Sequence, residues 1–122
     1  GMASLAAREK GIAGLVADGG VRDREEIESF EFPVFARHLV PTTGRTRLKV
    51  EAINVPVEID GVCVEPGDVI VADGTGVVCV PLDSSTRVAD IAEACASDDR
   101  QAEKEIRAGL SFSEAMRKFS RI

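Results

Sequence analysis

The spacing of apolar residues divides the chain into a β-rich part and a helical part. Short runs of Val, Ile and Leu, separated by Gly, Pro and Asp, fill the first two thirds of the sequence. This pattern is typical of strands joined by turns. From Asp83 onward apolar residues recur at helical spacing, as in Val88, Ile91 and Cys95. At 122 residues we expect one α/β domain over residues 1–122, in which residues 83–122 form a C-terminal helical segment.

The same pattern places the individual elements. In the first part of the chain, helices are predicted over residues 2–10, followed by Gly11, and over residues 24–30. In the last part, one helix is predicted from residue 83 onward and a second from residues 97–99 onward. A final helix is predicted over residues 113–119, after a break at Gly109. Strands are predicted over residues 11–17, 31–37, 46–57, 62–64, 69–72 and 77–80, with His38 in a loop.

Two turn sequences join the last three predicted strands. Pro66-Gly67-Asp68 and Asp73-Gly74 are residues that favour tight turns, so a series of hairpins is expected. The strands themselves are almost continuously apolar, which predicts that both of their faces are covered.

The chemistry of the chain is concentrated at Asp18–Asp23, directly after the first predicted strand. Gly19 and Gly20 can let a backbone approach a ligand, and Arg22 carries a planar fork that suits a carboxylate. Asp23 offers a hard oxygen ligand for Mg²⁺ and can cap the following helix together with Glu26. From spacing alone, a tight turn with a surface salt bridge explains the same residues equally well.

Composition excludes some classes of function. The net charge of −6 and the absence of Trp and Tyr argue against a nucleic-acid-binding protein. No apolar run is long enough for a membrane span, and we expect no signal peptide. We take Gly1, before Met2, as a tag remnant. Cys63, Cys79 and Cys95 form no CxxC pair and are expected to be free thiols, Cys63 and Cys79 buried, which fits the cytoplasm.

Six stretches of this sequence resemble one known family. The chain resembles the family named for the regulator of ribonuclease activity A, which includes 4-hydroxy-4-methyl-2-oxoglutarate and carboxymethyl-oxaloacetate aldolases. The resemblance extends over roughly residues 3–110, and the stretches that carry it are residues 11–14, 18–23, 32–36, 53–57, 61–68 and 72–78.

The resemblance implies a fold, a reaction and a set of site residues. It implies a swivelling β/β/α domain in a trimer or hexamer, with Mg²⁺ or Mn²⁺ and a pyruvate-like 2-oxo acid bound between subunits. Arg22 matches the family's substrate-gripping arginine, beside Gly19 and Gly20, and Asp23 matches its metal-associated aspartate. Glu103 of a neighbouring subunit, with Glu105 as the second choice, would complete the metal shell. The reaction would be retro-aldol cleavage or oxaloacetate decarboxylation, with pyruvate as product.

The resemblance also implies an N-terminal part of the family's proteins that has no match in this sequence. Family members carry an upstream N-terminal half with a glycine-acidic loop that holds the pyruvate carboxylate and orients a water. That loop has no counterpart here, so we expect impaired aldolase activity or an N-terminal half supplied by another polypeptide. The alternative is a non-enzymatic regulatory protein like the ribonuclease E inhibitor RraA. A methyltransferase, an older label for the family, is disfavoured because no G-x-G-x-x-G spacing is present.

Overall fold

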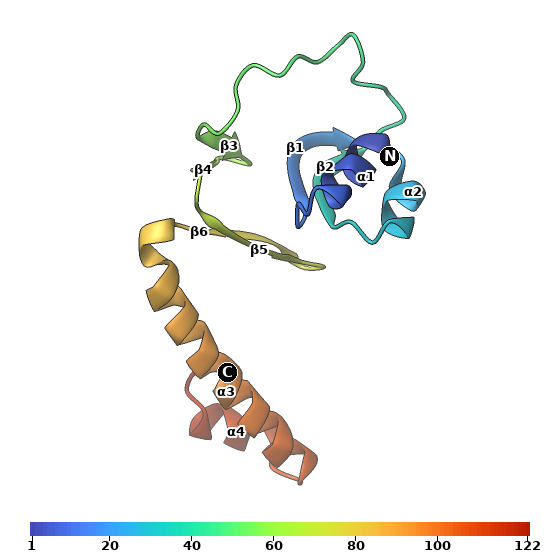
Figure 1. Cartoon of the computed structure of the whole chain (residues 1–122). Helices are drawn as coiled ribbons and strands as arrows, with labels where there is room; N and C mark the ends of the chain where they lie inside the picture. Colours follow the sequence, from blue (N-terminus) through green and yellow to red (C-terminus); the bar gives the residue numbers. More distant parts are fainter. The chain divides into compact units, whose positions relative to one another are not determined.

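The computed structural model describes residues 1–122, which divide into two compact units, Gly1–Cys79 and Val80–Ile122. Figure 1 labels the elements along the chain. The α-helices are α1 (Met2–Glu9), α2 (Arg24–Ser29), α3 (Ser85–Arg107) and α4 (Phe112–Lys118), and a 3₁₀ turn, η1, covers Leu82–Ser84. The strands are β1 (Leu15–Val21), β2 (Val34–Leu39), β3 (Val57–Ile59), β4 (Val62–Val64), β5 (Val69–Asp73) and β6 (Gly76–Val80).

The first unit begins with a helix and a βαβ arrangement. β1 and β2 pair in parallel, and α2 lies in the connection between them, as a parallel connection requires. Ile27 of α2 and Phe32, just before β2, are the buried apolar side chains here. The strands differ from the predicted ones by a few residues, because β1 extends through Asp18-Gly19-Gly20 and β2 includes His38, which we had expected in a loop.

Two antiparallel hairpins complete this unit. β3 pairs with β4 across Asp60-Gly61, where both residues have positive φ, the requirement of the tightest hairpin turns. β5 pairs with β6 across Asp73-Gly74-Thr75, as predicted. The expected hairpin at Pro66-Gly67-Asp68 is wrong, because β4 and β5 belong to different two-stranded sheets.

The predicted strand over residues 46–57 is also wrong for most of its length. Between β2 and β3, residues 40–56 contain one turn and no strand. The alternation of apolar and polar residues is present, but Leu48, Val50 and Ile53 are 82%, 75% and 83% exposed. A strand needs a hydrogen-bonded neighbour, and nothing in the chain pairs with this segment.

The second unit consists of two packed helices. α3 is one uninterrupted helix, so the predicted second helix beginning at residues 97–99 is wrong. Ala102 of α3 and Ala115 of α4 are buried. α4 begins with a complete capping box in which Ser111 and Glu114 each bond the other's backbone N–H.

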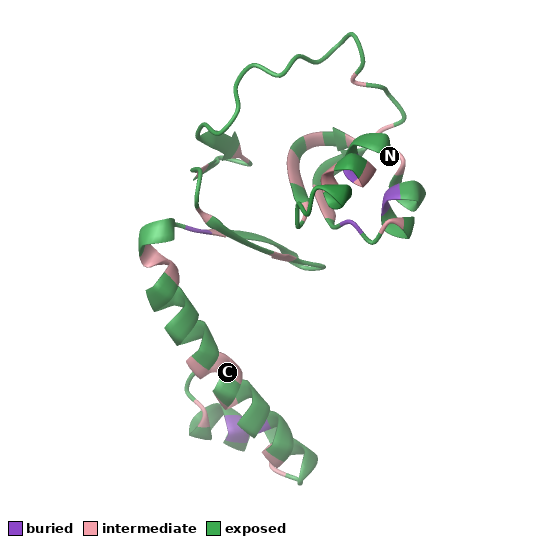
Figure 2. Cartoon of the chain, viewed as in Figure 1, coloured by how far each residue is buried: buried purple, intermediate pink, exposed green.

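Figure 2 shows how few residues are buried in the chain taken by itself. Val62, Val69, Val71 and Val78 of the hairpins are all more than 40% exposed, so the expectation of two covered faces is not met. The three cysteines are free, as predicted, but Cys63 is exposed and the other two are only half-buried. No helix is both long enough and apolar enough to cross a bilayer.

Candidate functional site

The predicted motif lies where β1 ends and α2 begins. β1 ends at Val21, and Arg22 and Asp23 form the short connection to α2. The Nε atom of Arg22 lies 3.2 Å from Oδ2 of Asp23. A guanidinium and a carboxylate therefore stand together at the carboxyl end of a parallel strand, the edge at which α/β proteins bind ligands.

The backbone of Asp23 is in the left-handed region, with φ 65° and ψ 43°. Aspartate and asparagine tolerate this conformation better than most residues, and such positions are concentrated at functional sites. Asp23 is the N-cap residue of α2, but its side chain makes no capping hydrogen bond, so the predicted capping box with Glu26 is absent. The carboxylate is therefore not used to hold the helix.

Instead, the carboxylate of Asp23 faces positive groups. The amino group of Gly1 donates a hydrogen bond of 3.0 Å to its Oδ2 and lies 4.0 Å from Oε2 of Glu26. This hydrogen bond, together with the charge of Arg22, holds the pKa of Asp23 below its usual value. Apart from Gly1, which we take as a tag remnant, Arg22 is the positive group beside this carboxylate.

The two glycines of the motif have different surroundings. A Cβ atom at Gly20 would lie 2.6 Å from Cγ2 of Val40, so β1 and the chain after β2 pack tightly there. A Cβ atom at Gly19 would meet nothing within 4 Å. Neither glycine has a positive φ. Only Gly19 therefore presents backbone to open space, as a ligand-contacting glycine would.

The predicted acidic residues Glu103 and Glu105 lie on α3, in the second unit. Glu103 pairs with Arg107, four residues along the same helix, at 2.6 Å. Glu105 accepts a hydrogen bond of 3.0 Å from Gln101 and one of 2.6 Å from Lys118 of α4. Glu105 thus connects two helices, whereas Glu103 has only a local partner on an exposed face.

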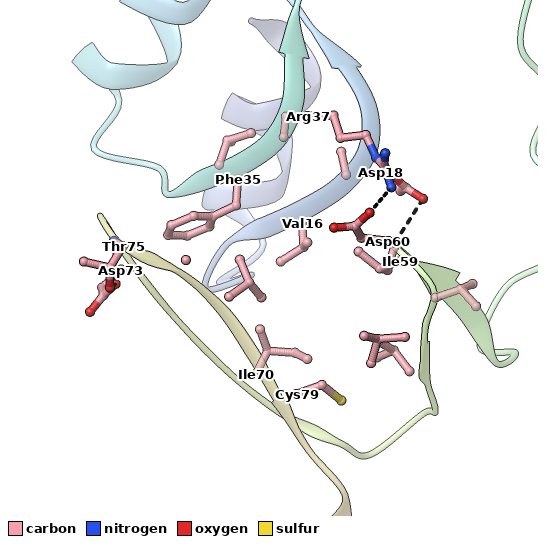
Figure 3. Close-up of a pocket in the computed structure, with 18 of the residues that line it drawn as sticks. Val16, Asp18, Phe35, Arg37, Ile59, Asp60, Ile70, Asp73, Thr75 and Cys79 are labelled. Atoms are coloured by element: carbon pink, nitrogen blue, oxygen red, sulfur yellow. Dashed lines mark hydrogen bonds and ion pairs between the residues drawn. The ribbon is translucent and has the colours of Figure 1, made fainter.

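One group of polar residues was missed by the sequence analysis. Arg37 of β2 donates hydrogen bonds to Asp18 of β1 and Asp60 of the β3–β4 turn, and the N–H of Asp60 donates to Oδ2 of Asp18 at 3.2 Å. Figure 3 shows Arg37 pointing toward the two carboxylates. We refer to Asp18, Arg37 and Asp60 as the arginine network. Arg37 holds the pKa of Asp18 below its usual value.

This network borders a cavity of the first unit, which has a volume of about 750 Å³. Its walls are mostly apolar and come from all six strands, as Val16, Phe35 and Ile70 illustrate in Figure 3. Gly19, Gly20, Arg22 and Asp23 do not line it. An apolar space between small sheets is a place for packing side chains, so the chemistry at Arg22 and Asp23 is separate from it.

Three or more carboxylate, histidine or cysteine side chains do not converge anywhere in the chain to form a ready metal cage. Asp23 and Glu26 are acids at the start of α2. This donor set of hard oxygens suits Mg²⁺ or Mn²⁺.

Comparison with known proteins identifies the family. The model of the RraA-like family, described as Aldolase/RraA, matches residues 1–79. The chain belongs to this RraA-like aldolase family. The prediction of the family and of its α/β fold is thereby confirmed, and the matched residues include the whole Asp18–Asp23 motif.

Individual relatives agree with this assignment. An uncharacterized protein of Methanocaldococcus jannaschii is 40% identical over 116 residues, which are 95% of this chain and 55% of that protein. The 4-hydroxy-4-methyl-2-oxoglutarate aldolase of Thermus thermophilus is 37% identical over 73 residues, which are 60% of this chain and 44% of that protein. A crystal structure of an uncharacterized protein from Pseudomonas syringae pv. tomato aligns with a TM-score of 0.88 at 32% identity and covers 93% of this chain and 57% of that one. The RraA-like chain thus spans about half the length of the relatives it matches.

Proposed function

We propose that this RraA-like chain contributes to a divalent-metal-dependent lyase that releases pyruvate from a 2-oxo acid. The observation that carries the proposal is the adjacent pair Arg22 and Asp23 at the exit of β1, with the guanidinium 3.2 Å from the carboxylate. The substrate would be 4-hydroxy-4-methyl-2-oxoglutarate, the compound in the name of the Thermus thermophilus relative, or oxaloacetate.

The residues at this exit fit Mg²⁺ or Mn²⁺. The carboxylate of Asp23 makes no capping hydrogen bond, so its oxygens are available to a ligand. Mg²⁺ is commonly bound through only one or two carboxylates, with substrate and water oxygens as the remaining ligands. Asp23 would hold the ion directly, and Glu26, in the first turn of α2, is the candidate to hold one of its waters. The bound ion would supply the positive charge that stabilises an enolate oxygen.

Arg22 and Gly19 would bind the 2-oxo acid. Arg22 is exposed and offers further N–H donors beyond the one near Asp23, so it can hold a substrate carboxylate through two parallel hydrogen bonds. The open space at Gly19 lets a small ligand approach the backbone of β1. These residues bind and orient the substrate, and none of them is a general base for a substrate hydroxyl.

The two candidate reactions make different demands on proton transfer. In decarboxylation of oxaloacetate, the bond to the departing carboxylate breaks, CO₂ leaves, and the electron pair forms the enolate of pyruvate, which takes a proton from water. Aldol cleavage also needs a base that removes the proton of the substrate hydroxyl, and lacking such a base costs about 10²–10⁴-fold. We therefore expect oxaloacetate decarboxylation to exceed aldol cleavage in this chain.

A neighbouring subunit is proposed to complete the site. Of the two predicted metal ligands on α3, Glu103 is the better candidate because Glu105 is held by Lys118 of α4. The pair of Glu103 with Arg107 is an exposed pair on one helix, which contributes little stability and is readily exchanged for another partner. A trimer or hexamer would bring such a helix to another copy's Asp23.

A non-enzymatic regulatory binding protein is the second candidate. Family members of this kind bind a partner protein, and in them the aspartate that matches Asp23 is commonly replaced. Asp23 is present here, which favours the enzyme over the regulator.

Calorimetric titration with Mn²⁺ tests the metal site. Asn tolerates the left-handed backbone of Asp23 as well as Asp does, so Asp23→Asn removes the negative charge without new strain. We expect this substitution to abolish measurable Mn²⁺ binding, and Asp83→Asn, in η1, to leave it unchanged. Equal affinity in wild type and Asp23→Asn would exclude Asp23 from the site.

Release of pyruvate tests the reaction. We expect weak, EDTA-sensitive pyruvate release from oxaloacetate with Mg²⁺ or Mn²⁺, less from 4-hydroxy-4-methyl-2-oxoglutarate, and a large loss in Arg22→Ala. Activity that survives EDTA would contradict the metal dependence, and no release from either substrate would favour the regulatory candidate. Faster aldol cleavage than decarboxylation would show that a base exists elsewhere.

A further inference from the structure

The most informative polar group outside the proposed site is the arginine network, because one of its members, Asp18, lies at an irregularity in the pairing of β1. Ala17 pairs with Ala36, whereas the next pair is Gly20 with His38. β1 therefore uses two residues, Asp18 and Gly19, where β2 uses one. This is a β-bulge, a feature that redirects a strand and occurs often next to active sites.

The residue of β2 opposite the bulge is Arg37. Its guanidinium donates to Oδ1 of Asp18 from Nε and to Oδ1 of Asp60 from a terminal nitrogen. The backbone N–H of Asp60 bonds the other oxygen of Asp18. Both carboxylate oxygens of the bulge residue are therefore occupied, and the three residues form a closed ring of hydrogen bonds.

The third member is placed by a tight turn. Asp60 has φ 51° and precedes Gly61, so the β3–β4 hairpin turns sharply and directs the N–H of Asp60 at Asp18. The hairpin tip and the bulge are thus joined through Arg37, as the dashed lines in Figure 3 show for the drawn residues. Charge-assisted hydrogen bonds of this kind are stronger than neutral ones.

The other end of the bulged segment is fixed as well. The N–H of Val40 bonds the carbonyl of Val21 at 3.0 Å, and Gly20 packs against Val40. Gly19 lies between these two fixed points, with free space beyond it. The backbone that leads into Arg22 therefore takes its direction from Asp18 on one side and Val21 on the other.

From this arrangement we propose that Arg37 is a positioning residue for the substrate-binding strand exit: it holds Asp18 and Asp60 together and so fixes the bulge that aims Gly19 and Arg22. The inference rests on the proposed function. A single exposed ion pair would contribute at most about 1 kcal/mol to stability. The arginine network has a different role, because it sets the direction of a strand whose next residues bind the ligand.

Two substitutions separate positioning from simple stabilisation. Arg37→Gln keeps a polar side chain but removes the charge and the fork, and Arg37→Lys keeps the charge as a single point. Arg24→Gln is the matched control, because it breaks the exposed pair of Arg24 with Glu28, at 2.6 Å on α2, outside the network. Asp60→Asn weakens only the contact to Arg37 and keeps the backbone bond to Asp18.

The experiment measures amide hydrogen exchange at residues 19–21 and, by calorimetry, the affinity of the chain for pyruvate with saturating Mn²⁺. Misplacing a binding group by about 1 Å costs up to about 100-fold, so we expect Arg37→Gln to weaken pyruvate binding about 10- to 100-fold and to speed exchange at Gly19 and Gly20. In both pyruvate affinity and exchange rate, Arg37→Lys and Asp60→Asn should fall between wild type and Arg37→Gln. Mn²⁺ affinity should stay unchanged in all variants, and Arg24→Gln should match wild type in every measurement.

Each other outcome has a distinct meaning. Unchanged exchange in Arg37→Gln would overturn the positioning role whatever the ligand results are. Faster exchange with unchanged pyruvate affinity would make the network purely structural. Loss of Mn²⁺ affinity in Arg37→Gln would mean general unfolding and would also overturn the proposal. Absence of Mn²⁺ and pyruvate binding in the wild type would reject the proposed function itself, and the positioning role with it.

Discussion

Small differences in local space decide what each residue of the strand exit can do. Asp23 occupies a left-handed backbone conformation that few side chains tolerate, and its carboxylate makes no capping hydrogen bond to the helix it precedes. Gly19 and Gly20 are neighbours in sequence, yet one faces open space and the other faces Val40. The roles of these glycines can therefore be separated by experiment.

Alanine substitutions should separate them. Gly20→Ala places a methyl group against Val40 and should destabilise the fold by about 1–3 kcal/mol, the usual cost of overpacking. Gly19→Ala has room for its methyl group and should be neutral or stabilise by up to about 1 kcal/mol through the unfolded chain. Urea unfolding monitored by circular dichroism measures both. An equal loss in the two variants would contradict the different packing described here.

At the scale of residues, the sequence predicts contacts between adjacent site residues well, and it predicts contacts between residues far apart in the chain poorly. Arg22 and Asp23 are covalent neighbours after an apolar run, so their association at a strand exit could be expected from spacing. Asp18, Arg37 and Asp60 come together only because β1 pairs with β2 in parallel and the β3–β4 turn reaches the bulge. Nothing in the spacing of these three residues indicates that register.

At the scale of elements, some local turn residues predicted element boundaries correctly, whereas elements that depend on a pairing partner were predicted less well. Asp73-Gly74 and Gly109 mark real boundaries, because their backbone preferences act locally. The alternating segment of residues 46–57 lacks a strand over most of its length because no other segment of the chain pairs with it. Ser97, Asp98 and Asp99 did not interrupt α3, since a long helix tolerates polar residues on its exposed faces.

The link between α3 and α4 predicts a response to acid. The hydrogen bond from Gln101 and the ammonium of Lys118 lower the pKa of Glu105 below its usual value near 4.5. A lowered folded-state pKa means that Glu105 contributes stability above pH 4.5, and that this contribution is lost as the pH falls through the folded-state value. We therefore expect the helices to lose part of their stability below pH 4.5 for this reason.

Glu105→Gln tests this expectation in a titration of helix content from pH 7 to pH 2. The variant should be less stable than wild type at pH 7, and the difference should shrink below pH 4.5. Glu103→Gln is the matched control, because its pair with Arg107 lies within α3 and joins no second helix. A difference between wild type and Glu105→Gln that stays constant with pH would contradict the role of the ionised carboxylate.

At the scale of the whole molecule, large apolar side chains on several elements have no cover. They include Val71 and Val78 of the β5–β6 hairpin, at 58% and 59% exposure, and Ile91 of α3, at 53%. Contiguous exposed apolar surface in soluble proteins usually marks an interface. We therefore expect the chain to assemble, with a trimer as the first choice.

Light scattering coupled to size exclusion measures the assembly. Val71→Lys tests the hairpin as an interface and Ile91→Lys tests α3, and each should reduce the assembled fraction if its surface is used. Lys49→Gln, a change between polar residues, should leave the assembly unchanged. A stable monomer of 13.0 kDa would contradict the expectation.

The irregular segment between β2 and β3 has a mechanical consequence for the arginine network. A segment of roughly 17 residues behaves as a tether whose ends lie about 20–25 Å apart on average. A hairpin on such a tether remains near β1 at an effective concentration in the millimolar range, even when it is undocked. Exposed bonds to Arg37 can therefore keep Asp60 in place. The β3–β4 hairpin can bind reversibly to the strand that leads to Arg22, because the linker keeps it close when those bonds break.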